Sequence, residues 1–175
     1  MTKPSNNSEA GSGAAQVYLS AGSNIAPEKH LRLACRELAA SYGELELSAV
    51  YRNPAEGFEG DEFLNMVIGF RTDASPEQII ERLEGIHQQA ERQRNENRFS
   101  SRTLDLDLLL YGSVVKRQLK LPHDDIEKYS FVAKPLAEIA PDRMHPVSGL
   151  TMREIWDNFE QDQHPLEEIE LSLLH

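Results

Sequence analysis

Cysteine, basic residues and long apolar runs are all scarce in this sequence of 175 residues. The single cysteine, Cys35, excludes an intramolecular disulfide framework, and its place beside Ala34 in a predicted helix favours a buried structural thiol over a nucleophile. No stretch approaches the roughly 20 apolar residues of a membrane-spanning helix, and residues 1–15 lack the apolar core of a signal peptide. We therefore expect a cytoplasmic protein without a membrane partner.

Acidic residues outnumber basic ones, because 18 Lys and Arg stand against 29 Asp and Glu and give a formal net charge of −11. This balance disfavours nucleic acid as a partner, since binding a polyanion requires clustered cations. The acids gather at the C-terminus, where residues 151–175 hold seven acidic residues and one basic residue, Arg153. Residues 92–102 have a positive net charge instead, because they hold four arginines and one glutamate, and so form a local basic patch.

Hydrophobic periodicity predicts four strands and two helices in the order β, α, β, β, α, β. Strands are expected at 16–20, 45–51, 63–72 and 103–111, and helices at 27–42 and 76–92. Pro27 and Gly43 bound the first helix, and Ser75 caps the second. This order is that of the ferredoxin-like α+β fold, in which two helices cover one face of a four-stranded antiparallel sheet and leave the other face available.

The two ends of the chain differ in composition from the middle. Residues 1–15 are rich in Ser, Asn, Gly and Ala and are expected to be a flexible tail, residues 16–160 a single domain, and residues 161–175 an acidic tail. After the fourth strand we expect a short hairpin at 114–121, a loop at 122–123 and helical segments at 131–139 and 151–159.

Asp105 and Asp107 alternate with leucines in the predicted strand at 103–111, which has the strongest strand pattern in the sequence. Residues at i and i+2 of a strand lie on one face, so the two carboxylates can bind Mg²⁺ together with a substrate phosphate. A solvated strand face explains the pair alone equally well. The arginines upstream favour a phosphotransfer site, because guanidinium groups beside paired carboxylates can hold a polyphosphate with its metal ions. The fingerprints G-x-x-x-x-G-K-S/T and G-x-G-x-x-G of the common nucleotide-binding folds are absent.

Other polar and aromatic residues carry weaker signals. His123 can donate a hydrogen bond to a phosphate, although a lone loop histidine is more often simply exposed. Asn65 lies in an apolar strand, where its amide either reads the edge of a ring or faces solvent. Phe58, Phe63, Phe99 and Phe131 can stack on a flat ligand, but phenylalanine is also the typical core residue.

Four segments, which span about residues 17–141, carry a family resemblance. They are YLSAGSN (18–24), YRNPAEGFEGDEFLN (51–65), RFSSRTLDLDLLLYG (98–112) and LPHDDIEKYSFVAKPLAEIAP (121–141). In order and spacing they resemble the 6-hydroxymethyl-7,8-dihydropterin pyrophosphokinases of folate biosynthesis. The resemblance implies a ferredoxin-like fold and the transfer of pyrophosphate from ATP to the hydroxymethyl group of the pterin, with release of AMP.

The resemblance also implies a role for each candidate residue. It makes Asp105 and Asp107 the ligands of two Mg²⁺ ions, and it makes Arg92, Arg94, Arg102 and His123 the contacts of the co-substrate ATP. Arg92 and Arg102 would also offset charge during catalysis. The pterin pocket would consist of Asn53, Ala55, Phe63, Asn65, Phe99 and Phe131. We expect small molecules as the partners, and a monomer.

Several residues depart from the family pattern and keep other hypotheses open. Ser100 and Ser101 replace a usual Gly-Pro, Asp124 replaces an aromatic residue, Tyr129 a cation and His87 an acid. The loop at 52–61 is about one residue short. A diverged, weakly active or non-catalytic pterin-binding paralogue is therefore the alternative. An RNA-binding domain shares the element order, but the acidic net charge and the lack of an RNP-like aromatic strand disfavour it.

Overall fold

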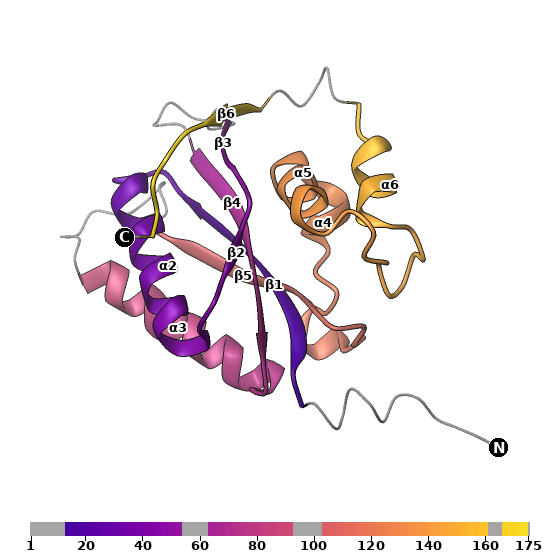
Figure 1. Cartoon of the computed structure of the whole chain (residues 1–175), viewed down its shortest axis with the longest axis horizontal. Coiled ribbons are helices and arrows are strands. Elements are labelled where there is room, and N and C mark those ends of the chain that lie inside the picture. The colour runs from indigo at the N-terminus through magenta and orange to yellow at the C-terminus, as the bar shows by residue number, and fades with distance from the viewer. Residues whose placement is uncertain (1–12, 54–62, 93–102, 161–165, 175) are drawn as a thin grey trace.

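The computed structural model describes residues 13–53, 63–92, 103–160 and 166–174 of the chain (Figure 1). Six strands in these ranges form one sheet, and every pair of neighbouring strands is antiparallel. They are β1 (Ala15–Ser23), β2 (Glu46–Leu47), β3 (Val50–Asn53), β4 (Phe63–Thr72), β5 (Asp105–Tyr111) and β6 (Glu167–Ile169). The sheet order is β5-β1-β4-β3-β6, and β2 pairs with β4.

Two long helices, α2 (Pro27–Tyr42) and α3 (Pro76–Arg92), lie along one face of the sheet (Figure 1). α2 begins with a proline, which has no N–H to leave unpaired, and ends where Gly43 takes a φ of 87°. α3 begins with reciprocal capping, in which Gln78 N–H donates to Ser75 Oγ at 3.1 Å and Ser75 N–H donates to Gln78 Oε1 at 2.8 Å. The order β5-β1-β4-β3 with two helices on one face confirms the predicted ferredoxin-like fold.

The main core lies between the sheet and these two helices. Alternate strand residues such as Leu19 and Ile68 are fully buried there against Leu38 of α2 and Ile79 of α3. Cys35 belongs to the same core, and burial raises the pKa of its thiol to about 12. The cysteine is therefore a buried structural thiol, as predicted.

The opposite face of the sheet is partly covered, which corrects the prediction that it is left available. A second core joins Tyr18, Val67 and Leu110 of the sheet to the later helices. These are α4 (Asp125–Lys128), α5 (Ser130–Ile139) and α6 (Met152–Asp157), drawn in orange in Figure 1. Helical periodicity identifies apolar stripes but does not reveal which face of a sheet receives them. Asp105 and Asp107 lie beyond this apolar contact and keep intermediate exposure.

The predicted strand at 45–51 is interrupted between β2 and β3. Ser48 Oγ accepts the N–H of Val67 at 2.9 Å, and Ala49 donates its N–H to Glu138 Oε2 of α5 at 3.1 Å. Side-chain oxygens thus replace backbone partners at the break. The interruption ties the end of α5 to the sheet.

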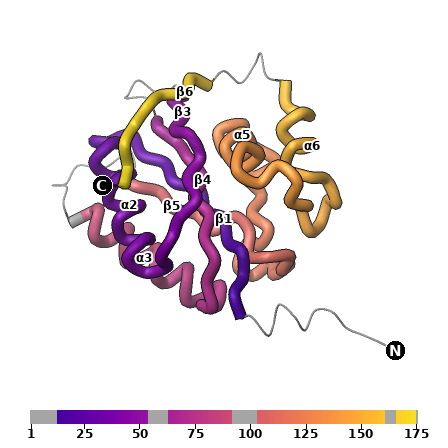
Figure 2. Tube along the Cα trace, viewed as in Figure 1, coloured from indigo at the N-terminus to yellow at the C-terminus, as the bar shows by residue number. Residues whose placement is uncertain are grey.

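The C-terminal third differs from the prediction in two ways. The hairpin expected at 114–121 is a single bridge between Lys116 and Leu121 around the 3₁₀ turn η1 (Arg117–Leu119). Part of the segment expected to be an acidic tail forms β6, which pairs with β3. The chain then continues past α2, as the yellow end of the tube in Figure 2 shows. Among the described residues, no helix combines the length and the apolar character needed to cross a membrane.

Candidate active site

The strand register brings the predicted site residues into rows across the sheet. Gly22 of β1 pairs with Asp105 of β5 on one side and with Asn65 of β4 on the other, and Asn65 pairs in turn with Tyr51 of β3. Directly opposed residues of antiparallel strands point to the same face. Asp105 and Asn65, 40 residues apart in sequence, therefore flank one glycine on the face that carries α5.

An irregularity in β5 sets the boundary between this polar region and the second core. Tyr18 pairs with Leu110 and Leu19 pairs with Leu108, so that Leu109 is an extra residue in the β5 ladder. The extra residue reverses the alternation, since Leu108 belongs to the main core and Leu110 to the second core. The carbonyl of Leu109 accepts the N–H of His123 at 3.0 Å. The irregularity thus anchors the loop that carries the candidate phosphate ligand.

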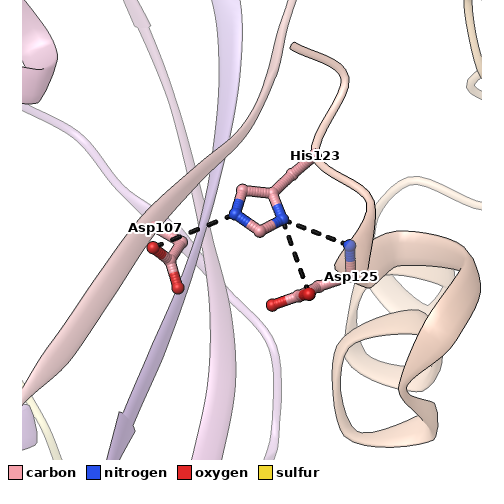
Figure 3. Close-up of side chains that lie close together, drawn as sticks. All are labelled: Asp107, His123 and Asp125. Carbon is pink, nitrogen blue, oxygen red and sulfur yellow. Dashed lines mark hydrogen bonds and ion pairs between the residues drawn. The ribbon is translucent and has the colours of Figure 1, made fainter. Parts of the chain in front are cut away.

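His123 lies between two carboxylates (Figure 3). Its Nε2 is 4.0 Å from Asp107 Oδ1, and its Nδ1 is 3.7 Å from Asp125 Oδ1. Asp125 N–H donates to Nδ1 at 3.1 Å, so Nδ1 is the unprotonated nitrogen of the neutral ring and Nε2–H faces Asp107. One ligand atom from each of the three side chains lies within 4.8 Å of the others. Because both ring nitrogens are engaged in this tautomer, the group offers a cation its two carboxylates.

The electrostatic environment of Asp107 is that of a site for positive charge. Burial raises the pKa of its carboxyl, and the nearby Asp105 and Asp125 raise it further, whereas His123 and His87 act in the opposite direction. The carboxylate form of Asp107 is therefore poorly stabilised, because too little water and too little positive charge lie near it. A divalent cation bound to Asp105 and Asp107 would relieve this repulsion.

We expect this arrangement to give a pH-dependent cost in folding stability. A carboxyl whose pKa is raised by folding binds more protons in the folded state than in the unfolded chain. Its contribution to the free energy of unfolding is largest below the ordinary aspartate pKa of about 3.9 and is lost as the pH rises through the raised value. The stability of Asp107→Asn relative to the wild type, measured by urea unfolding without metal, should therefore increase with pH. A pH-independent difference would contradict the assigned environment.

Asn65 and Asn53 form the amide part of the site. Asn65 is only 7% exposed, and its Nδ2 donates to Asn53 Oδ1. This burial excludes the interpretation of Asn65 as a solvent-facing strand residue. A Cβ atom added to Gly22 would lie 2.7 Å from Asn65 Oδ1, so the amide occupies the space that the glycine leaves. The absence of a side chain at Gly22 is thus needed for this position of the amide, a requirement that motif analysis missed.

The two aromatic residues of the predicted pterin pocket that the structure describes come from different layers. Phe63 begins β4 and pairs with Asn53, whereas Phe131 lies in the first turn of α5. Phe131 stacks on Tyr129, with ring centroids 5.0 Å apart and planes at 15°. Tyr129, at a position where the resemblance suggests a cation, therefore extends an aromatic surface. A pterin ring held between Phe63 and Phe131 stays a prediction.

Part of the predicted site belongs to segments other than the described ones. Arg94, Arg102, Ala55 and Phe99 lie outside the described residues, and the side chain of Arg92 at the end of α3 does too. The polyphosphate contacts assigned to the three arginines therefore remain predictions. Asp125 was missed by motif analysis, although its place two residues after His123 was a usable signal. His87 was noted only as a departure, and its contact with β5 depends on helix packing.

The fold and these polar residues define a ferredoxin-like domain with a candidate ligand site on the partly open face of its sheet. The model of the family described as 7,8-dihydro-6-hydroxymethylpterin-pyrophosphokinase (HPPK) matches residues 18–141. The chain belongs to this family.

Curated relatives support the same assignment. A 2-amino-4-hydroxy-6-hydroxymethyldihydropteridine pyrophosphokinase of Aquifex aeolicus is 33% identical over 144 residues, which cover 80% of this chain and 89% of the relative. The protein of the same name from Synechocystis sp. is 39% identical over 136 residues, covering 75% of this chain and 69% of the relative.

Solved structures support the fold alone. A crystal structure of Plasmodium falciparum HPPK-DHPS aligns with a TM-score of 0.65 at 11% identity and covers 82% of this chain. The chain spans 45% of the length of that protein.

Proposed function

We propose that this chain transfers pyrophosphate from ATP to 6-hydroxymethyl-7,8-dihydropterin in folate biosynthesis and releases AMP. Membership of the family supports the reaction. The observation that carries it in the structure is the row in which Asp105 and the buried amide of Asn65 flank Gly22. Two strand spacings of about 4.8 Å separate the carboxylate from the amide, a distance suited to a bicyclic ring whose edge is read at one end and whose substituent reacts at the other.

The chemistry requires mainly positioning and compensation of negative charge. The hydroxymethyl oxygen of the pterin forms a bond to the β-phosphorus of ATP, and the bond from that phosphorus to the oxygen bridging the α-phosphate breaks. AMP leaves with the bridging oxygen, and the hydroxyl proton passes to solvent. In this proposal His123 Nε2–H donates to a phosphate oxygen. Arg92, Arg94 and Arg102 hold the polyphosphate.

Mg²⁺ is the cofactor that the donor set fits. Mg²⁺ prefers oxygen ligands and commonly binds to one or two carboxylates together with phosphates and waters. Asp105 and Asp107 supply two carboxylates on one face, and their mutual repulsion is part of the cause of the raised pKa of Asp107. When bound, two such ions would neutralise polyphosphate charge and align the hydroxyl with the phosphorus.

The pterin would occupy the other end of the row. We assign the reading of its edge to Asn65, with Asn53 and Ala55 along the wall, and its stacking to Phe63, Phe99 and Phe131. Tyr51 OH donates to Glu138 Oε1 at 2.9 Å, and this bond docks α5 on β3 and so holds Phe131 over the sheet. We further propose that the protein acts as a monomer in the cytoplasm and has neither nucleic acid nor a membrane as a partner.

The test is AMP release from Mg-ATP with and without 6-hydroxymethyl-7,8-dihydropterin. We expect pterin-dependent AMP from the wild type and none above background from Asp105→Ala, because the variant lacks half of the carboxylate pair. Pterin binding measured by fluorescence in parallel separates recognition from chemistry. Binding without AMP would refute the catalytic proposal and favour a pterin-binding paralogue, for which the stacking of Tyr129 in place of a cation is the specific observation.

A further inference from the structure

His87 of α3 contacts the edge of the sheet at the residue between Asp105 and Asp107. β5 is an outer strand, so the N–H groups of alternate residues point away from β1. Leu106 N–H is one of these, and it donates to His87 Nε2 at 2.9 Å. The imidazole thus supplies the hydrogen-bond acceptor that a further strand would otherwise supply.

The contacts of His87 fix its ring on both sides. Because Nε2 accepts a hydrogen bond, the proton of the neutral ring lies on Nδ1, which is 3.4 Å from Glu84 Oε1 one turn earlier in α3. The helix itself is held by Ile86 and Ala90, which are buried in the main core. The acceptor nitrogen therefore belongs to a rigid part of the molecule.

Leu106 links this contact to both carboxylates. Its side chain is buried in the main core beneath α3, while its neighbours Asp105 and Asp107 point to the opposite face. With the side chain packed and the N–H bonded to His87, the backbone at Leu106 has two fixed points. A displacement at this residue would move the carboxylates on either side of it.

We propose that His87 is a positioning residue for the divalent-cation site, acting through the backbone of Leu106 to hold Asp105 and Asp107 in register. The inference rests on the proposed function, since it assumes that the two carboxylates bind the cation. Groups that orient metal ligands without touching the metal commonly change metal affinity by roughly 10- to 100-fold when they are removed.

The choice of histidine has a second consequence for the site. An acid at position 87, which the family resemblance suggests, would also accept the Leu106 N–H but would add a third negative charge. The neutral ring of His87 accepts the same N–H without adding a negative charge beside Asp105 and Asp107. The chain retains the acceptor and avoids the additional repulsion.

Three substitutions separate the acceptor from other effects of the ring. His87→Leu removes the acceptor at similar size, His87→Gln restores a neutral acceptor of similar reach, and Glu84→Gln removes the charge beside Nδ1 only. For each full-length protein we would measure amide hydrogen exchange at Leu106 by NMR. We would also measure Mn²⁺ affinity by EPR titration in the presence of α,β-methylene-ATP, in which a methylene group replaces the oxygen between the α- and β-phosphorus.

We expect His87→Leu to exchange the Leu106 amide at least about tenfold faster and to bind Mn²⁺ about tenfold more weakly. His87→Gln should return both values to near those of the wild type, and Glu84→Gln should leave them unchanged. Equal Mn²⁺ affinity in the wild type and His87→Leu would overturn the proposal, as would a loss in His87→Gln as large as that in His87→Leu. Neither measurement needs turnover. If the Mn²⁺ affinities of the variants follow the expected order but the wild type forms no AMP, the proposed function is refuted and the positioning role of His87 is retained.

Discussion

Asp107→Asn is expected to lower kcat/KM for AMP formation by about a thousandfold while leaving the fold intact. Removing one negative oxygen from the pair weakens the cation site, and a bound metal ion supplies several kcal/mol of charge stabilisation in the transition state, of which about 4 kcal/mol corresponds to this factor. The fold should persist because Asp107 is part-exposed and faces the polar region rather than either core. Substitution also removes the repulsion that raises the pKa of this carboxyl, so the melting temperature at neutral pH should equal or exceed that of the wild type.

The matched control is Asp142→Asn, which changes the same functional group on the surface. Asp142 is highly exposed and pairs with Arg153 at 3.1 Å, outside the polar rows of the sheet. A surface ion pair contributes little to stability, so turnover and melting temperature should both stay near those of the wild type. Near-normal turnover in Asp107→Asn would remove this carboxylate from the mechanism. Equal losses in both variants would indicate a general effect of charge.

The fold was predictable because its signals are local. Pro27 and Gly43 bound α2, and Ser75 and Gln78 cap α3, so the helices follow from residues a few positions apart. The period of two in β5 is equally local, and it is sufficient to predict that its two aspartates share one face. The partial covering of that face by α5 and α6 was not predictable, because it depends on contacts between distant apolar surfaces.

The site was predictable in its parts but not in its arrangement. The extra residue Leu109 reverses the alternation of β5, and nothing in a run of leucines marks which one will lack a partner. The adjacency of Asp105, Gly22 and Asn65 depends on the register of three strands, which is set only when the sheet forms. The bond from Leu106 to His87 likewise requires α3 and β5 to be packed together.

Gly22→Ala is expected to weaken pterin binding by roughly ten- to a hundredfold. The added Cβ would lie 2.7 Å from Asn65 Oδ1, so the amide must move, and its donation to Asn53 would be lost with it. Losing well-placed hydrogen bonds from a buried amide costs about 1–3 kcal/mol, which corresponds to this range of affinity. Titration of 6-hydroxymethyl-7,8-dihydropterin by fluorescence measures the effect. The melting temperature, recorded on the same samples, reports any loss of stability.

Gly69→Ala is the control that separates a local effect from general strain in the sheet. Gly69 lies in β4 and approaches its neighbour almost as closely as Gly22 does, since an added Cβ would lie 2.9 Å from the ring of Tyr18. Tyr18 belongs to the covered, apolar part of the face, so this variant should lose stability without losing pterin affinity. A greater loss of affinity in Gly22→Ala than in Gly69→Ala, at equal loss of stability, would assign the effect to the space beside Asn65. Wild-type pterin affinity in Gly22→Ala would show that pterin binding does not depend on the position of this amide. Asn65 would then no longer be assigned to the pterin site.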